Sequence, residues 1–109
     1  MFNQMIMKSR LLLIDDEVVM LRVTKLMLDQ YGYDVETSST TSEAISILAS
    51  GDIDLILLDI SMPTIDGFDF IKLMNSLRIQ VPVVLLSNTD DDFTLKMALA
   101  EGVKTCISK

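Results

Sequence analysis

Short runs of apolar residues alternate with stretches of helical periodicity along the chain. Continuous apolar runs occupy residues 11–14, 55–58 and 83–86. Strands buried on both faces have this composition, and they belong mostly to parallel sheets covered by helices. Between the runs, apolar residues recur at the spacing of an α-helix, which predicts four helices. The four stripes are Val19, Val23, Leu26 and Met27; Ala44, Ile47 and Leu48; Phe70, Met74 and Leu77; and Phe93, Met97 and Ala100.

Capping signals mark the ends of these helices. Thr40 and Glu43 have the spacing of a capping box, which predicts that a helix begins there. Gly32, Gly51 and Gly102 follow three of the periodic stretches and are expected to end their helices. The predicted strands lie at about 9–14, 34–37, 53–58, 82–87 and 105–108, and the predicted helices at about 17–30, 41–50, 67–77 and 91–100.

Strands that alternate with helices predict an α/β fold. Right-handed crossovers between such units build a doubly wound parallel sheet, and for five strands we expect the flavodoxin-like order 2-1-3-4-5. A length of 109 residues fits a single domain over residues 1–109. Residues 1–7 are expected to be a short irregular leader. They are not expected to be a signal peptide, because basic residues follow the apolar part and there is no small-residue cleavage site.

Composition excludes several classes of function. A net charge of −7 argues against binding of nucleic acid or an anionic membrane by this domain. The absence of His excludes Ser-His-Asp triads and imidazole-dependent zinc sites. A single Cys cannot form an internal disulfide, which favours a reducing, cytoplasmic location.

Polar residues follow the predicted strands at the points where the strands end. Asp15 and Asp16 follow the first apolar run, Asp59 the second and Ser87 the third, and Lys109 follows the last predicted strand. Because the carboxyl ends of parallel strands share one edge, these groups are expected to converge there. Two carboxylates ~4 Å apart repel by ~4 kcal/mol at an effective dielectric of 20, so such a cluster calls for a cation. Hard oxygen ligands favour Mg²⁺, with Mn²⁺ as a substitute.

An aspartate beside Mg²⁺ can act as a nucleophile on phosphorus and form an acyl phosphate. The Lys109 ammonium and the Ser87 hydroxyl would then stabilise the added phosphoryl group. A purely structural interpretation is that the acidic residues after the first strand favour the N-terminus of the following helix. This interpretation does not explain why polar or charged groups also follow the other predicted strands, so we favour the functional one.

The chain resembles the receiver domain of two-component response regulators, from about Lys8 onward. The residues that carry the resemblance are Asp15-Asp16-Glu17, Asp59-Ile60-Ser61-Met62-Pro63-Thr64-Ile65-Asp66-Gly67, Ser87 and Lys109. The resemblance implies that Asp59 accepts phosphate from a phosphohistidine of a sensor histidine kinase or phosphotransfer protein. It further implies that Asp16, Asp59 and the backbone carbonyl of Ser61 hold Mg²⁺, with Asp15 acting directly or through water. Lys109 would contact the phosphoryl group.

The resemblance also implies how the signal leaves the site. Ser87 would move toward the phosphoryl group and change the face formed by the helix at 91–100 and the strand at 105–108. Ser61 and Thr89 would tune the rate of phosphate loss. Cys106 stands where the family usually has Tyr or Phe, so the coupling to this face is expected to differ. Taken alone, Cys106 is a small buried hydrophobe.

The chain ends at Lys109, whereas receiver domains continue, usually with Pro, into a fifth helix. We therefore expect a fragment of a longer regulator, or a homodimer or strand-swapped dimer that covers the face left by this helix.

Three functions remain open from the sequence. The first is a phosphoacceptor switch that does not turn over an external substrate. The second is an interaction module on the same fold that works without phosphorylation. The third and least favoured is a Mg²⁺-dependent phosphohydrolase, because no second acid–base group or phosphate-binding glycine loop is present.

Overall fold

The computed structural model describes residues 9–59, 67–87 and 105–108. The elements in these ranges are β1 (Arg10–Ile14), α2 (Val18–Gln30), β2 (Asp34–Ser38), α3 (Thr41–Ala49), β3 (Leu55–Asp59), α4 (Gly67–Ser76), β4 (Val83–Ser87) and β5 (Thr105–Ser108). Each lies where the sequence predicts it, with ends that differ by at most two residues. The helix predicted at 91–100 and the leader at 1–7 lie outside the described residues. Within the described part of the chain, no helix combines the length and apolar character needed to cross a bilayer.

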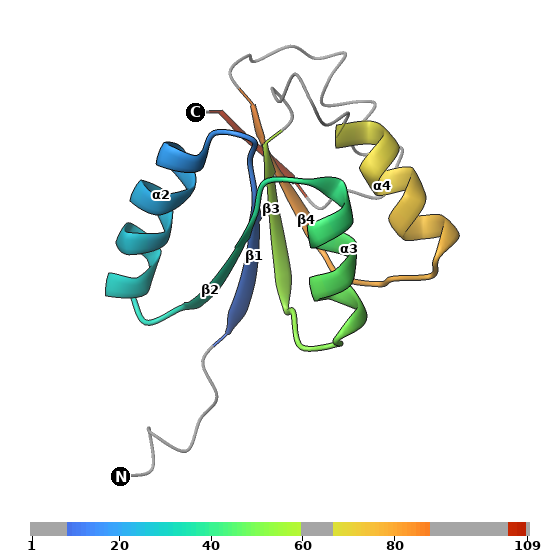
Figure 1. Ribbon diagram of the computed structural model, residues 1–109, viewed down its shortest axis with the longest axis horizontal. Helices are drawn as coiled ribbons and strands as arrows, with labels where there is room; N and C mark the ends of the chain where they lie inside the picture. Colours follow the sequence, from blue (N-terminus) through green and yellow to red (C-terminus); the bar gives the residue numbers. More distant parts are fainter. Residues whose placement is uncertain (1–8, 60–66, 88–104, 109) are drawn as a thin grey trace, which may run out of the picture.

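All five strands are parallel and lie in the order β2-β1-β3-β4-β5. The predicted strand order is therefore confirmed. Helix α2 covers one face of the sheet, and α3 and α4 lie on the other (Figure 1). In this arrangement the carboxyl ends of all strands point to the same edge, which is the edge where ligands bind in such sheets.

The core is divided by the sheet into two unequal halves. Alternate residues of a strand point to opposite faces, so Leu12 and Ile14 of β1 pack toward α3 and α4, whereas Leu11 and Leu13 pack toward α2. The larger cluster consists of Leu12, Ile14, Ala44, Leu48, Ile53, Ile56, Leu58, Phe70, Ile71, Met74, Val83 and Leu85. The smaller contains Leu11, Leu13, Leu21 and Val35, with partly buried leucines around it. Among the described residues, the face that carries α3 and α4 therefore holds the larger buried cluster.

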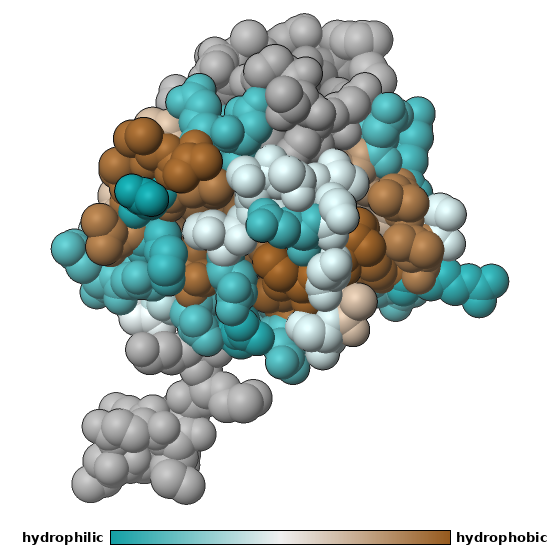
Figure 2. Space-filling view, viewed as in Figure 1, coloured by the Kyte–Doolittle hydropathy of each residue, from teal (hydrophilic) through white to brown (hydrophobic). Residues whose placement is uncertain are grey.

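The apolar stripe that predicts α2 does not face the sheet. Val19 is 71% exposed and Leu26 is 65% exposed, and Val23 and Met27 are also exposed. Leu21 is instead the buried residue of the helix. Because α2 carries apolar residues on both sides, its periodicity does not reveal which side meets the sheet. Figure 2 shows the resulting apolar surface over α2.

Lys25 of α2 binds the backbone of β2, a strand at the edge of the sheet. The Lys25 ammonium donates a hydrogen bond to the backbone carbonyl of Val35 on β2 (3.0 Å) and pairs with Asp29 (3.3 Å). Strand β2 is the outermost strand at this side of the sheet. A lysine bound to the backbone of an edge strand blocks unwanted pairing with another chain.

In the apolar stripe that predicts α4, Phe70 and Met74 are buried, whereas Leu77 is 50% exposed. The reason is that α4 ends at Ser76. The next turn reverses at Arg78, which has a φ of 59°, and the Ile79 N–H donates back to the carbonyl of Met74 (2.9 Å). Leu77 therefore lies beyond the end of the helix and is exposed to solvent.

The predicted helix caps are confirmed where the structure describes them. The Glu43 N–H donates to the Thr40 hydroxyl (3.1 Å), and the Glu43 carboxylate accepts from the Ser39 N–H (3.1 Å). The end of α2 requires a left-handed residue, which Gly32 supplies with a φ of 90°. Gly51 takes a similar φ of 86° after α3.

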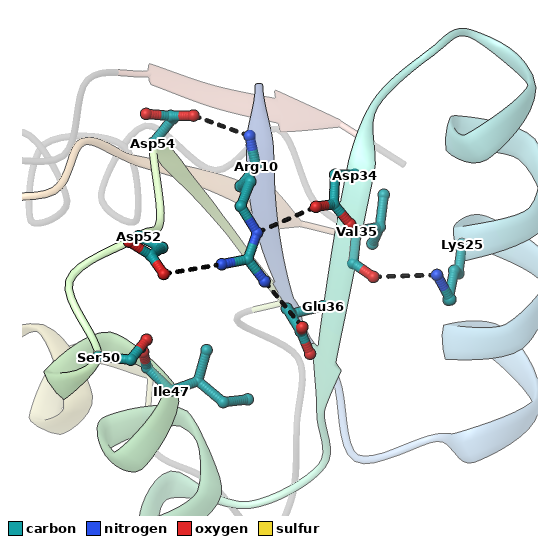
Figure 3. A network of polar contacts seen from close by, with 9 residues as sticks. All are labelled: Arg10, Lys25, Asp34, Val35, Glu36, Ile47, Ser50, Asp52 and Asp54. Atoms are coloured by element: carbon teal, nitrogen blue, oxygen red, sulfur yellow. Dashed lines mark hydrogen bonds and ion pairs between the residues drawn. The ribbon is translucent and has the colours of Figure 1, made fainter. Parts of the chain in front are cut away.

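A cluster of acidic residues surrounds Arg10 at the amino edge of the sheet (Figure 3). The guanidinium contacts Glu36 at 2.8 Å, Asp34 at 3.1 Å and Asp52 at 3.4 Å. The backbone N–H of Arg10 donates to the Asp54 carboxylate (2.8 Å), and the Asp54 N–H donates to the carbonyl of Arg10 (2.8 Å). One side chain therefore links β1 to β2 and to the loop that enters β3.

Candidate functional site

The strand register brings two carboxylates together at the carboxyl edge of the sheet. Ile14 of β1 lies opposite Leu58 of β3, so the next residues, Asp15 and Asp59, emerge at neighbouring positions. Asp15 is 7% exposed and Asp59 is 4% exposed. Carboxylates are seldom this deeply buried, so two of them at neighbouring strand ends mark this edge as a candidate site.

Asp15 is held through both its backbone and its side chain. Its N–H donates to the carbonyl oxygen of Ser38 at the end of β2 (3.1 Å). Its carboxylate oxygen Oδ1 accepts from the N–H of Glu17 (3.0 Å), in the turn that leads into α2. This bond orients the turn before α2 but is not a cap of the helix itself, because Glu17 is the N-cap residue and its side chain makes no capping hydrogen bond. Asp15 thus supports this turn and also follows the strand end next to that of Asp59.

Asp16 follows Asp15 and is half-buried. Among the described residues, no three His, Cys, Asp or Glu side chains are grouped closely enough to hold a metal ion. In the described part of the chain, the strand register places Asp15 and Asp59 at neighbouring strand ends, and the predicted three-carboxylate cluster stays a prediction. Mg²⁺ usually takes one or two carboxylates and keeps several waters, so the chemistry of this donor pair fits Mg²⁺.

Of the remaining predicted residues, one lies at the same edge, one lies within a strand, and three lie outside the described residues. Ser87 is the last residue of β4, next to the position where Leu86 pairs with Asp59. Cys106 lies in β5 opposite Leu85. Ser61, Thr89 and Lys109 are outside the described residues, although Lys109 directly follows the end of β5 in the sequence.

Ser38 is a residue of this edge that sequence reasoning missed. It is 1% exposed, ends β2, and contacts Asp15 through its backbone carbonyl. The capping box at Thr40 and Glu43 was recognised only as a helix start. The capping box directly follows the end of β2, and this position in the sequence could have indicated that the turn between β2 and α3 borders the site.

Carboxylates are the kind of ligand that hard cations prefer, and a carboxylate can also act as a nucleophile on phosphorus. Asp59 ends β3 and pairs with Leu86 of β4, and the residue before it, Leu58, pairs with Ile14 of β1. A nucleophile on a rigid strand end, with a second carboxylate beside it, is suited to a metal-assisted transfer reaction on phosphorus.

Comparisons with protein families, related sequences and solved structures all point to the same family. The model of the response regulator receiver domain matches residues 11–109. The response regulator SaeR of Staphylococcus aureus is 33% identical over 101 residues, which cover 93% of this chain and 44% of SaeR. The chain thus spans less than half the length of this relative.

Two solved structures have the same fold. The chemotaxis protein CheY4 of Vibrio cholerae superposes with a TM-score of 0.85 at 26% identity, over 94% of this chain and 88% of that chain. The BeF3-activated N-terminal receiver domain of RstA from Klebsiella pneumoniae gives a TM-score of 0.82 at 26% identity, over 93% and 86%.

Proposed function

The chain belongs to the response regulator receiver domain family, and we propose that Asp59 is its phosphoacceptor. Receiver domains are typically non-catalytic modules of two-component signalling that act with a histidine kinase and bind Mg²⁺. The observation that carries the proposal is the burial of Asp59 beside Asp15 at the carboxyl ends of β3 and β1.

In the proposed reaction, a carboxylate oxygen of Asp59 attacks the phosphorus of a phosphohistidine on a sensor kinase or phosphotransfer protein. The new oxygen–phosphorus bond forms as the phosphorus–nitrogen bond breaks. The leaving imidazole nitrogen keeps the bonding electron pair and takes up a proton from water. The product is an acyl phosphate on Asp59.

We assign the metal ligands to Asp59, Asp16 and the backbone carbonyl of Ser61, with Asp15 acting directly or through water. The burial of Asp59 and Asp15 at neighbouring strand ends supports a cation site here, and Asp16 directly follows Asp15 in the chain. When bound, Mg²⁺ neutralises charge on the phosphoryl oxygens.

Lys109 and Ser87 complete the proposed response. The Lys109 ammonium would contact the phosphoryl group, and the Ser87 hydroxyl would donate a hydrogen bond to it. Ser87 ends the strand next to Asp59, which supports this role. The change would pass to the face formed by residues 91–100 and β5, with Cys106 altering the coupling and Ser61 and Thr89 setting phosphate loss.

Intact mass spectrometry tests the proposal. The chain is incubated with Mg²⁺ and acetyl phosphate, alongside a sample without metal and the variant Asp59→Asn. Asp52→Asn is the matched control, since it makes the same chemical change at the opposite edge of the sheet. We expect one phosphoryl adduct that requires Mg²⁺ and Asp59 and that persists in Asp52→Asn.

Other outcomes would point to the alternatives. An adduct that survives Asp59→Asn would contradict the assignment of the phosphoacceptor. No adduct, together with partner binding unchanged by Asp59→Ala, would favour the phosphorylation-independent interaction module. Continuous turnover of a free phosphate ester, lost in Asp59→Asn, would favour a phosphohydrolase.

A further inference from the structure

We infer that Ser38 is a positioning residue for the acidic site, acting through the backbone of Asp15. This inference rests on the proposed function, because it concerns how the metal-binding edge is held. It begins from the 3.1 Å hydrogen bond in which the Asp15 N–H donates to the Ser38 carbonyl. This bond extends the β1–β2 ladder by one step, beyond the pair formed by Ile14 and Ser38.

The Ser38 side chain makes several hydrogen bonds next to this backbone contact. Its hydroxyl donates to the carbonyl of Thr40 (2.8 Å) and lies 3.4 Å from a Glu43 carboxylate oxygen. The same hydroxyl oxygen accepts from the Thr40 N–H (3.4 Å). A serine hydroxyl that contacts the backbone two residues ahead closes a tight turn. This turn reverses the chain directly after β2.

The turn is anchored to the core at its far end. The Thr40 carbonyl also accepts from the N–H of Ala44 (3.1 Å), which is fully buried in the first turn of α3. The Glu43 carboxylate holds the turn from the other side, through the Ser39 N–H (3.1 Å). The path of contacts therefore runs from Ala44 through Thr40 and Ser38 to Asp15.

The geometry indicates what the hydroxyl contributes. Ser38 is 1% exposed, so no water replaces its hydroxyl if the side chain is shortened to Ala. The turn would then lose its bond to Thr40, and the Ser38 carbonyl would lose its fixed direction. Asp15 would keep its carboxylate but not its place beside Asp59. The expected consequence is weaker cation binding without loss of any proposed ligand.

The test measures Mg²⁺ binding to the unphosphorylated chain by calorimetry, and hydrogen exchange at the Asp15 amide without metal. We expect Ser38→Ala to weaken Mg²⁺ binding by about tenfold, the lower end of the range for residues that orient metal ligands. The Asp15 amide should exchange faster in this variant. Ser38→Thr, which restores a hydroxyl, should recover most of both properties.

Ser50→Ala is the matched control. Ser50 also donates its hydroxyl to a backbone carbonyl, that of Ile47 (2.6 Å), but at the opposite end of α3. It should lower stability modestly while leaving Mg²⁺ affinity and Asp15 exchange unchanged. If Ser38→Ala does not fold, Glu43→Ala removes the acceptor of the Ser39 N–H and should shift both readouts in the same direction.

The outcomes separate this inference from the proposed function. If the wild-type chain binds Mg²⁺ and Ser38→Ala binds it equally well, Ser38 is only structural and the inference is wrong. Equal effects of Ser38→Ala and Ser50→Ala would also overturn it. If the wild-type chain binds no Mg²⁺ and forms no adduct on Asp59, the proposed function fails and the inference falls with it.

Discussion

Ile14 of β1 and Leu58 of β3 lie opposite each other in the parallel ladder, and neither exposes any surface to solvent. This pair sets the positions of the two carboxylates that follow. Leu58→Ala should lower the free energy of unfolding by about 2–5 kcal/mol, because it leaves a cavity in the larger core cluster. Urea denaturation measures the loss.

Leu57 provides the comparison for this variant. It is a leucine of the same strand, but it points to the face with the smaller buried cluster and is only partly buried. Leu57→Ala should cost less than Leu58→Ala. Equal losses would mean that the two faces of the sheet contribute alike, contrary to the observed burial.

The orientation of α2 gives a second prediction, in which the same substitution is made on its two sides. Leu21 is 5% exposed and Leu26 is 65% exposed. Leu21→Ala should lower the free energy of unfolding by about 2–3 kcal/mol. Leu26→Ala should change it by less than about 0.5 kcal/mol. A larger loss for Leu26→Ala in thermal melts would show that the exposed stripe is covered in solution.

Arg10 gives a third prediction. Arg10→Met removes the cation that contacts Asp34, Glu36 and Asp52, and leaves their carboxylates to repel one another. We expect a loss of about 1–2 kcal/mol, which is modest because the network is partly exposed to solvent. The loss should shrink as salt concentration rises, since salt screens the repulsion.

Two further variants test this explanation for Arg10. Arg10→Lys keeps the charge but not the planar fork, so its stability should fall between wild type and Arg10→Met. Arg22→Met removes a cation from the exposed surface of α2 and should have little effect on stability. A loss in Arg10→Met that does not depend on salt would show that packing, rather than charge, explains the role of Arg10.

A fourth prediction uses the left-handed residues that end α2 and α4. Arg78 has a φ of 59° and Gly32 has a φ of 90°. Arg78→Gly should raise the free energy of unfolding by about 1 kcal/mol, because glycine adopts this conformation without steric strain. Gly32→Ala should lower it by a similar amount. Space is not the cause at Gly32, since a Cβ there would meet no atom within 4 Å. Stabilities that change in the same direction for both variants would contradict this account.

Much of the fold and of the candidate site followed from local sequence patterns. Buried parallel strands leave a strong signal because both of their faces are apolar, as at residues 55–58. Once those strands are parallel, their carboxyl ends share an edge. Asp15 and Asp59 were therefore expected to converge before any contact was known, and the strand register agrees. The roles of Lys109, Ser61 and Thr89 stay predictions, because these residues lie outside the described part of the chain.

Local sequence patterns did not predict contacts between residues that are far apart in the chain. Arg10 meets Asp34 and Asp54 across 24 and 44 residues, and no local pattern pairs them. The inner side of α2 was likewise undetermined, because apolar residues occupy both sides of that helix.

The sequence by itself determined the order of the elements, the parallel sheet and the acidic residues at its carboxyl edge, because these depend on short-range periodicity and strand direction. Only the tertiary structure decided that Leu21 faces the sheet and Val23 the solvent. It alone placed the Ser38 carbonyl on the N–H of Asp15. The physical reason is that helix rotation and turn contacts depend on how neighbouring elements pack, and residues far apart in the chain make those contacts.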